Sequence, residues 1–137
     1  MGFANAEEVY KIFGMTLDKM KKENEALYNS LAGVDMVLTQ KLPNLDATIT
    51  LEMKNGMIKP TYGPIDIKPD AMTTQNDDIF IKFWQGKLNL MMAMTKGQVK
   101  SSGAVTKMLK LLPKIGPVYK LFAETLKEAG REDLIIK

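Results

Sequence analysis

A predicted β-hairpin constrains the fold of this chain more than any other segment does. Apolar and polar side chains alternate along residues 47–54, a second extended run covers residues 57–62, and Asn55-Gly56 lies between the two runs. Both central residues of a type I′ turn have a positive φ, which asparagine and glycine tolerate better than other residues do. The sequence therefore predicts two antiparallel strands joined by a two-residue turn.

The length of this turn also predicts which residues pair across the hairpin. It places Glu52 opposite Lys59 and Thr50 opposite Thr61, and a shift by one residue would turn every side chain to the other face. Pro60 has no N–H group to offer a further strand, so we expect its strand at an edge of the sheet. The apolar face of the hairpin then consists of Ile49, Leu51, Met53, Ile58 and Tyr62.

Other patterns predict one long helix and three further strands. Apolar residues at helical spacing predict a helix from about Asn5 to Leu31. Residues 34–42 alternate as a half-buried strand does, residues 70–75 indicate a fourth strand, and residues 98–102 indicate a short fifth one. Glycine and proline divide the rest into short helices at about residues 77–85, 88–95, 105–112 and 117–129. We therefore predict an α+β fold in which the helices cover a mainly antiparallel sheet of about five strands.

Residues 79–123 carry the basic charge of the chain. They hold eight lysines and no acid, which leaves 11 of the 19 basic residues and all 16 acids for the remainder. The same segment is rich in flexible apolar side chains, methionines among them. This combination suits an apolar molecule with an anionic head, or the anionic membrane surface from which such a molecule comes. The lysines also fit an ordinary solvated face, and the sequence leaves both interpretations open.

The residues that the chain lacks exclude several kinds of site. It has no cysteine and no histidine, which excludes disulfides, thiol chemistry and metal sites built on thiolate or imidazole. The length of 137 residues suits a single domain, and no apolar run is long enough to span a membrane. The chain does not open on an apolar signal region, so we expect a cytoplasmic protein. We predict no metal ion and no cofactor.

The sequence favours binding over catalysis and over nucleic-acid recognition. Asp77 and Asp78 lie at a predicted helix start, where acids stabilise the exposed N–H groups, and capping explains them without a catalytic role. We therefore predict no catalytic residue and no enzyme activity. Arg131 is the one arginine in the sequence, and aromatic residues do not interleave with the basic ones as in an RNA-recognition sheet. We therefore predict no nucleic-acid partner.

The order of these motifs resembles the sterol carrier protein 2 family. That family has a Lys-Asn-Gly hairpin, here residues 54–56, and then an acidic helix start, here residues 77–78. It continues with a Gly-Lys-x-Asn motif, here residues 86–89, a glycine-flanked strand, here residues 97–103, and a leucine-rich helix, here residues 107–112. The resemblance implies a five-stranded sheet and helices that enclose an apolar tunnel for sterols, fatty acids, acyl-CoA or phospholipids, without catalysis.

The predicted short helices would supply the wall of such a tunnel. Their apolar faces are wider than one sheet face can cover, and this surplus motivates a ligand space between sheet and helices. Methionines here either fill gaps in an ordinary core or form a wall that adapts to ligands of varied shape. Lys87 and Lys100 are the candidates for contact with a ligand head group at an opening. The predicted wall residues are Ile79, Phe80, Phe83, Trp84, Leu88, Met91, Met94, Val105, Met108, Leu109, Leu112, Val118, Leu121 and Phe122.

The residues and the resemblance together predict binding and transfer of a lipid or fatty-acyl ligand. Transient contact with an anionic membrane surface fits this function. The alternative is a cytoplasmic interaction module whose apolar groove receives a helix of a partner protein. The two hypotheses differ in shape, because a carrier needs an enclosed cavity of roughly several hundred Å³. An interaction module would instead expose an open apolar strip on its surface.

Overall fold

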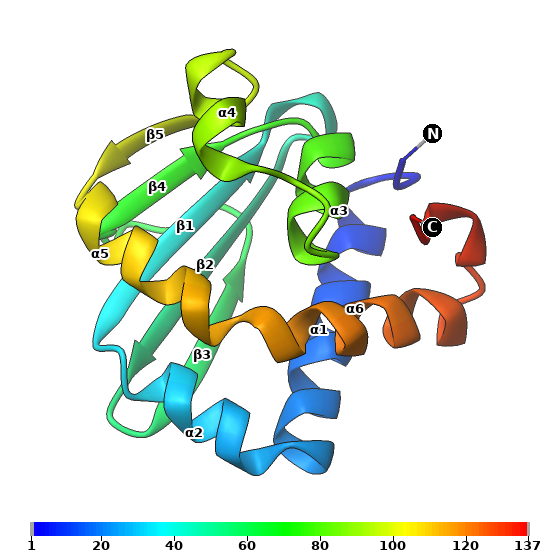
Figure 1. The fold of residues 1–137 in the computed structure, drawn as a ribbon, viewed down its shortest axis with the longest axis horizontal. Coiled ribbons are helices and arrows are strands. Elements are labelled where there is room, and N and C mark those ends of the chain that lie inside the picture. Colours follow the sequence, from blue (N-terminus) through cyan, green and yellow to red (C-terminus); the bar gives the residue numbers. More distant parts are fainter. Residues whose placement is uncertain (1, 137) are drawn as a thin grey trace.

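The computed structural model describes residues 2–136 and shows an α+β fold in that range (Figure 1). Five strands form one sheet in the order β3-β2-β1-β4-β5, and every neighbouring pair is antiparallel except β1 and β4. This confirms the predicted fold class and the predicted number of strands. The elements in chain order are α1 (Ala6–Glu23), α2 (Glu25–Ala32), β1 (Met36–Leu42), β2 (Ala47–Lys54), β3 (Met57–Tyr62), β4 (Ala71–Thr74), α3 (Asp77–Trp84), α4 (Leu90–Thr95), β5 (Lys100–Gly103), α5 (Val105–Leu111) and α6 (Gly116–Glu128).

The hairpin of β2 and β3 has the predicted turn and register. Asn55 and Gly56 have φ angles of 56° and 71°, and Glu52 lies opposite Lys59. The strand that carries Pro60 lies at the edge of the sheet, as expected for a residue without an N–H group. The turn chemistry of two residues thus determines the side-chain direction of both strands.

The prediction of one helix from Asn5 to Leu31 is wrong, because Asn24 divides it into α1 and α2. The backbone of Asn24 leaves the helical region, with φ −144° and ψ 72°. Its N–H group closes α1 on the Met20 carbonyl at 2.8 Å, and its side chain accepts a hydrogen bond from the Leu27 N–H at 3.1 Å. An asparagine that caps a new helix in this way competes with continuation of the old one.

The strand predicted at residues 34–42 is present as β1, but the prediction that it is half-buried is wrong. The strand begins at Met36, after Asp35 with its left-handed φ of 53°, and residues 36–40 are all buried. Leu38 and Gln40 face the helices, whereas Val37 and Thr39 lie on the opposite face of this central strand. There the Thr39 hydroxyl is hydrogen-bonded to the Thr50 hydroxyl of β2 at 2.9 Å, so a polar side chain is buried on that face too.

Two smaller differences concern the elements around residue 95. The helix expected from Leu88 begins at Leu90, because the Asn89 side chain accepts a hydrogen bond from the Met92 N–H at 3.1 Å and caps it there. The fifth strand covers residues 100–103 rather than 98–102. Both shifts lie within the usual uncertainty of element boundaries.

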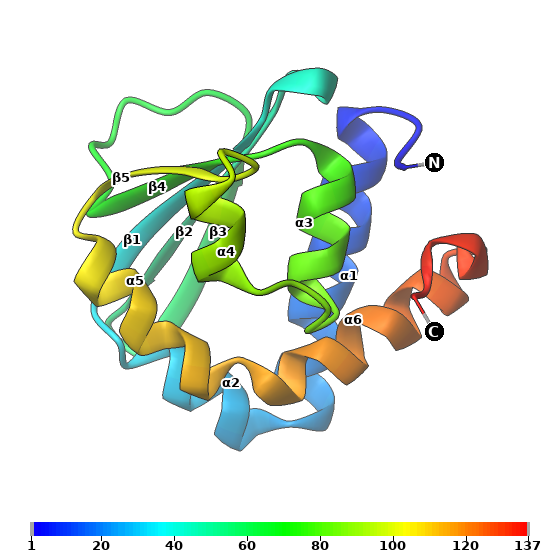
Figure 2. The same cartoon turned by 45° about the horizontal axis from the view of Figure 1, so that its top comes forward.

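The helices surround one face of the sheet (Figure 2). The helices α1 and α6 pack against each other, and the aromatic rings of Phe13, Phe80, Trp84 and Phe122 meet between the helices. The ring centroids of Phe13 and Trp84 are 5.4 Å apart, and those of Phe80 and Phe122 are 6.4 Å apart. These contacts make the α1–α3–α6 side of the helical layer a solid core.

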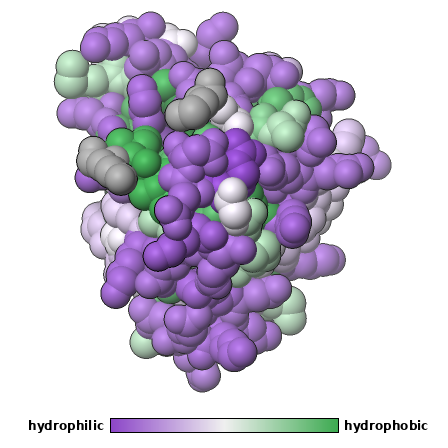
Figure 3. Space-filling view, turned by 90° about the vertical axis from the view of Figure 1, so that its right-hand side faces the viewer, coloured by the Kyte–Doolittle hydropathy of each residue, from purple (hydrophilic) through white to green (hydrophobic). Residues whose placement is uncertain are grey.

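Arg131 ties the two ends of the described chain together. Its guanidinium donates to the Glu8 carboxylate and to the Gly2 carbonyl, the latter at 2.9 Å, and it pairs with the Asp133 carboxylate at 3.1 Å. The hydrogen bond from Arg131 holds the pKa of Asp133 below its usual value. Figure 3 shows the side of the molecule on which these ends lie, and hydrophilic residues cover most of it.

We predict that Gly56→Ala destabilises the protein by about 1–2 kcal/mol, because alanine resists the left-handed conformation that Gly56 adopts. An added Cβ at Gly56 meets nothing within 4 Å, so the cost is conformational rather than steric. Urea denaturation followed by circular dichroism measures the change.

The matched control is Gly116→Ala. Gly116 begins α6 in equally open space and without a positive φ, so alanine there should be neutral or stabilising. Equal losses of stability in the two variants would contradict the proposed role of the turn.

Candidate functional site

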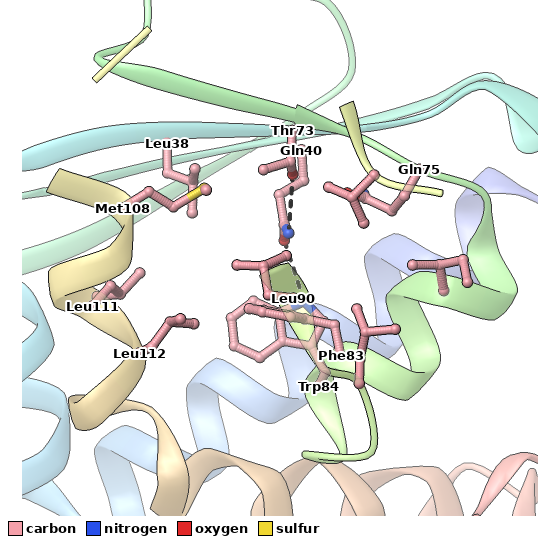
Figure 4. Close-up of a pocket in the computed structure, with 13 residues that line it drawn as sticks. Leu38, Gln40, Thr73, Gln75, Phe83, Trp84, Leu90, Met108, Leu111 and Leu112 are labelled. Carbon is pink, nitrogen blue, oxygen red and sulfur yellow. Dashed lines mark hydrogen bonds between the residues drawn. The ribbon is translucent and has the colours of Figure 1, made fainter. Parts of the chain in front are cut away.

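A narrow apolar cavity, the inner cavity, lies between the sheet and the helices α3, α4 and α5 (Figure 4). Its volume is about 20 Å³, which is room for one water-sized molecule. Side chains of the helices meet side chains of β1 and β4 across it. The lining residues are Leu38, Gln40, Thr73, Gln75, Ile79, Phe83, Trp84, Leu88, Leu90, Val99, Met108, Leu111 and Leu112.

Six of the predicted wall residues line the inner cavity. They are Ile79, Phe83, Trp84, Leu88, Met108 and Leu112. The structure thus brings parts of α3 and α5 together as predicted, and whether these residues bind a ligand remains a prediction. The space itself is far smaller than the tunnel that the resemblance implies, because leucine, methionine and phenylalanine side chains fill it.

A second cavity of about 20 Å³ lies beside the first and shares Trp84 and Leu111 with it. Val118 of α6, another predicted wall residue, lines this second cavity. The other lining residues come mainly from α1, α2 and the hairpin: Phe13, Thr16, Leu17, Met20, Leu31, Leu51, Met53, Ile58 and Ile115. Trp84 and Leu111 are therefore the partition between two small apolar spaces.

Seven predicted wall residues lie elsewhere. Phe80, Leu121 and Phe122 are buried in the solid core and line neither cavity. Met94, Val105 and Leu109 are half-buried and pack against the core from outside. Met91 is 56% exposed, so its assignment to the wall is wrong for this structure. Helical spacing identified these side chains as apolar, but it could not show which of them face the sheet.

Two open clefts adjoin the two cavities. The first, here called the β5 cleft, has a volume of about 340 Å³ and shares Gln75 and Ile79 with the inner cavity. It is lined by Pro43, Thr74, Gln75, Asn76, Asp78, Ile79, Gly97, Gln98 and Lys100. Lys100 therefore lies at an opening beside the inner cavity, as predicted, whereas Lys87 is exposed and lines none of these spaces.

The second cleft, here called the α1–β3 groove, has a volume of about 500 Å³ and shares Leu17 and Ile58 with the second cavity. Its lining mixes apolar groups with charged ones, namely Asp18, Lys21 and Lys59. Burial raises the pKa of the Tyr62 phenol in this groove, and Asp18 adds to the shift. The four spaces form a series through the molecule, separated by pairs of side chains.

A row of polar side chains crosses the sheet, and two of them, Gln40 and Thr73, are buried on the floor of the inner cavity. Gln40 of β1 lies opposite Thr73 of β4, which lies opposite Ser101 of β5. The Gln40 carboxamide accepts a hydrogen bond from the Trp84 indole at 3.2 Å and donates one to the Thr73 hydroxyl at 3.4 Å (Figure 4). Neighbouring Gln75 donates to the Lys41 carbonyl at 3.3 Å. These groups give an apolar space a set of uncharged hydrogen-bonding groups on one wall.

Sequence reasoning missed the polar row and also missed Leu90, Val99 and Leu111. Gln40 was passed over because it is polar. The available signal was the two-residue alternation, which places Gln40 on the same strand face as the apolar residues Met36 and Leu38. In the part of the chain that the structure describes, no three acidic residues gather as a metal site would need. None of the described helices combines the length and the apolar character that a membrane span needs.

Comparisons with known proteins identify a matching family, one curated relative and structures of the same fold. The model of the SCP-2 sterol transfer family matches residues 17–113, which include the whole sheet and the helices α3, α4 and α5. Among curated proteins, the peroxisomal multifunctional enzyme A of Dictyostelium discoideum is 31% identical over 93 residues. That match covers 68% of this chain and 21% of the relative, so the chain spans about a fifth of the relative's length.

Two solved structures share the fold. The sterol carrier protein domain 2 of Helicoverpa armigera superposes with a TM-score of 0.60 at 24% identity, over 80% of this chain and 88% of that one. A conserved protein of Thermus thermophilus, described as possibly a sterol carrier protein, superposes with a TM-score of 0.63 at 13% identity, over 90% of this chain and 93% of that one. At these identities the likeness shows a common fold.

We predict that Gln40→Leu destabilises the protein by about 1–3 kcal/mol, because it leaves the buried Trp84 indole N–H without an acceptor. The control is Gln98→Leu, which makes the same change at an exposed position and should leave stability nearly unchanged. Urea denaturation followed by the emission of Trp84 reports both. Equal stability of the two variants would show that the hydrogen bond contributes nothing.

Proposed function

The chain belongs to the SCP-2 sterol transfer family, and from this premise we propose that it binds and transfers a lipid or acyl ligand without catalysing a reaction. The ligands that fit this proposal are a sterol, a fatty acid, an acyl-CoA or a phospholipid. The observation that carries it is the series of four adjoining spaces, two of them apolar cavities between the sheet and the helices.

The two cavities would widen into one site around an acyl chain. They share Trp84 and Leu111 as lining residues, and α5 faces the inner cavity with the apolar side chains of Met108 and Leu111. Such contacts are not directional, so leucine and methionine side chains can change rotamer and pack against a ligand instead of against each other. The ligand then covers the apolar surface of the helices that the sheet covered before.

The energetics of such a site suit transfer. An acyl chain removed from water gains roughly 0.8 kcal/mol per methylene, on the order of 10 kcal/mol in total. It gains nearly the same in a bilayer, so exchange between membrane and protein is close to balanced. A carrier can therefore both load and release, and its selectivity comes from cavity shape and polar contacts.

Two different polar features would contact the ligand. Lys100 in the β5 cleft would attract a carboxylate or phosphate at the opening. The Gln40–Thr73 row would offer hydrogen bonds to a hydroxyl or carbonyl inside the cavity. A ligand with an anionic head group would thus place it at the opening, whereas a ligand with a neutral head group would place it inside the cavity.

The structure gives less support to the two other functions, which are binding of a partner helix and catalysis. The α1–β3 groove is the larger open cleft, but its charged lining is unlike the continuous apolar strip that a partner helix needs. The name of the Dictyostelium relative refers to a protein of which this chain matches about a fifth. We therefore infer binding, rather than any reaction of that longer protein, as the function of this chain.

We predict that Met108→Trp weakens binding of a fluorescent fatty acid, such as an anthroyloxy-labelled stearate, by at least about tenfold. Met108 is 4% exposed and lines the inner cavity, so an indole there would occupy the space of the acyl chain. Titration of the delipidated protein with the probe in solution measures the affinity. Leu112→Trp, at a half-buried lining position, gives a second test if the first variant does not fold.

The matched control is Met91→Trp, which adds the same indole at a position 56% exposed and outside the cavity. It should bind the probe as the wild type does. Unchanged affinity in both cavity variants, with the fold intact by circular dichroism, would contradict a ligand in the inner cavity.

A further inference from the structure

We propose that α4 is the helix through which this protein docks on an anionic lipid bilayer, and that the same helix is the lid of the inner cavity. The lid part of this inference rests on the proposed function, whereas the docking part does not. Four properties of α4 support it: its two-sided composition, its light attachment, the charge around it and its position over the cavity.

The composition of α4 divides it into an inner and an outer side. On the inner side Leu90 and Ala93 are buried, and Leu90 lines the inner cavity. On the outer side Met91 and Met92 are 56% and 52% exposed. Among the described residues only Met57 and Ile67 are other large apolar side chains with comparable exposure, and they lie singly in other parts of the chain. Two adjacent exposed methionines on one short helix are unusual for a surface that meets only water.

The attachment of α4 to the rest of the fold is light. Within residues 2–136, every hydrogen bond of α4 joins it to its own flanking segments, between the Asn89 cap and Val99. The one that reaches furthest along the chain runs from the Val99 N–H to the Ala93 carbonyl at 3.2 Å. The other helices are held differently, since α3, for example, bonds to the sheet through Trp84. Apolar contacts of Leu90 and Ala93 thus hold α4 in place, with no directional tie to another helix or to the sheet.

The charge around α4 is positive. Lys87 precedes it, and Lys96 and Lys100 follow it, all three exposed. None of them forms an ion pair with any residue that the structure describes. No Asp or Glu occurs between residues 79 and 123, although Asp78 lines the β5 cleft together with Lys100. Exposed methionines flanked by unpaired lysines match the apolar interior and the anionic surface of a bilayer.

The position of α4 connects docking with ligand exchange. The helix lies between α3 and α5, over the sheet (Figure 2). Leu88 just before it and Leu90 within it form part of the cavity lining. If the outer side of α4 enters the head-group region, movement of the helix toward the lipid withdraws these two leucines. The inner cavity then opens toward the bilayer rather than toward water, which spares the acyl chain from crossing an aqueous gap.

The experiment compares the full chain on two kinds of vesicle, phosphatidylcholine alone and phosphatidylcholine with about 30% phosphatidylserine, by co-sedimentation. We expect the wild type to bind the anionic vesicles preferentially. The double variant Met91→Gln/Met92→Gln should bind them about tenfold more weakly, because two half-exposed apolar side chains no longer enter the bilayer. Lys87→Gln and Lys96→Gln should each weaken binding by up to about fivefold.

Two matched controls test the location. Met57→Gln removes an equally exposed methionine at the hairpin, and Lys54→Gln removes an exposed lysine beside it. Neither should change vesicle binding. Equal losses of vesicle binding in the hairpin variants and the α4 variants would overturn the docking assignment. So would vesicle binding by the α4 double variant that equals that of the wild type, or a wild type that does not bind anionic vesicles.

The lid is tested by separating transfer from affinity. The rate of transfer of a pyrene-labelled fatty acid out of anionic vesicles should fall at least about fivefold in the α4 double variant. Its affinity for the same probe in vesicle-free solution should equal that of the wild type, because Met91 and Met92 do not line the cavity. An unchanged transfer rate together with weakened vesicle binding would overturn the proposal that α4 is a lid, while the proposal that α4 docks on the bilayer would stand. Failure of the wild type to bind the probe in solution would contradict the proposed function and the lid together, while the sedimentation result alone decides docking.

Discussion

The hydrogen bond from Trp84 to Gln40 is the constraint on which the arrangement around the cavity depends. Within residues 2–136 it is the one hydrogen bond that joins a helix to the cavity floor, at 3.2 Å. It fixes the end of α3 against the central strand, so the aromatic core behind α3 and the sheet in front of it keep a constant separation. The walls formed by α4 and α5 have no such bond to the cavity floor, although Lys107 on the outer side of α5 donates to the Asp35 carbonyl at 3.3 Å and pairs with Asp70. A fixed wall facing two adjustable ones is the geometry that an apolar ligand of variable shape requires.

The sequence predicted the parts of this architecture that short-range chemistry determines. The turn at Asn55-Gly56 set the register of β2 and β3, and the breaks at glycine and proline separated the short helices correctly. The prediction of one long helix failed at Asn24, because the residue whose side chain caps α2 also ends α1. That asparagine looks like any polar residue on the solvent face of a helix, so periodicity could not reveal the break.

The candidate site was predictable only on its helical side. Phe80 and Phe83 both lie on apolar positions of α3, yet one enters the solid core and the other lines the inner cavity. The difference depends on where α1 and α6 pack, which no local pattern contains. The floor of the cavity was missed for another reason: Gln40 shares a strand face with the apolar residues Met36 and Leu38, but it is polar, and its hydrogen-bond partner Trp84 comes from a distant helix. Long-range packing thus decided which residues form the site.

The most direct test of a ligand between sheet and helices uses the methionines, which are distributed inside and outside the proposed site. Met53 and Met108 line the two cavities, whereas Met91 and Met92 are 56% and 52% exposed and line none of the four spaces. In protein labelled with ¹³C at the methionine methyl groups, isotope-filtered nuclear Overhauser spectra with bound palmitate show which methyl groups touch the acyl chain. The account predicts contacts from the acyl chain to Met108 and Met53 and none to Met91 or Met92. Contacts to the exposed methionines alone, without any contact to Met108 or Met53, would contradict an internal lipid site.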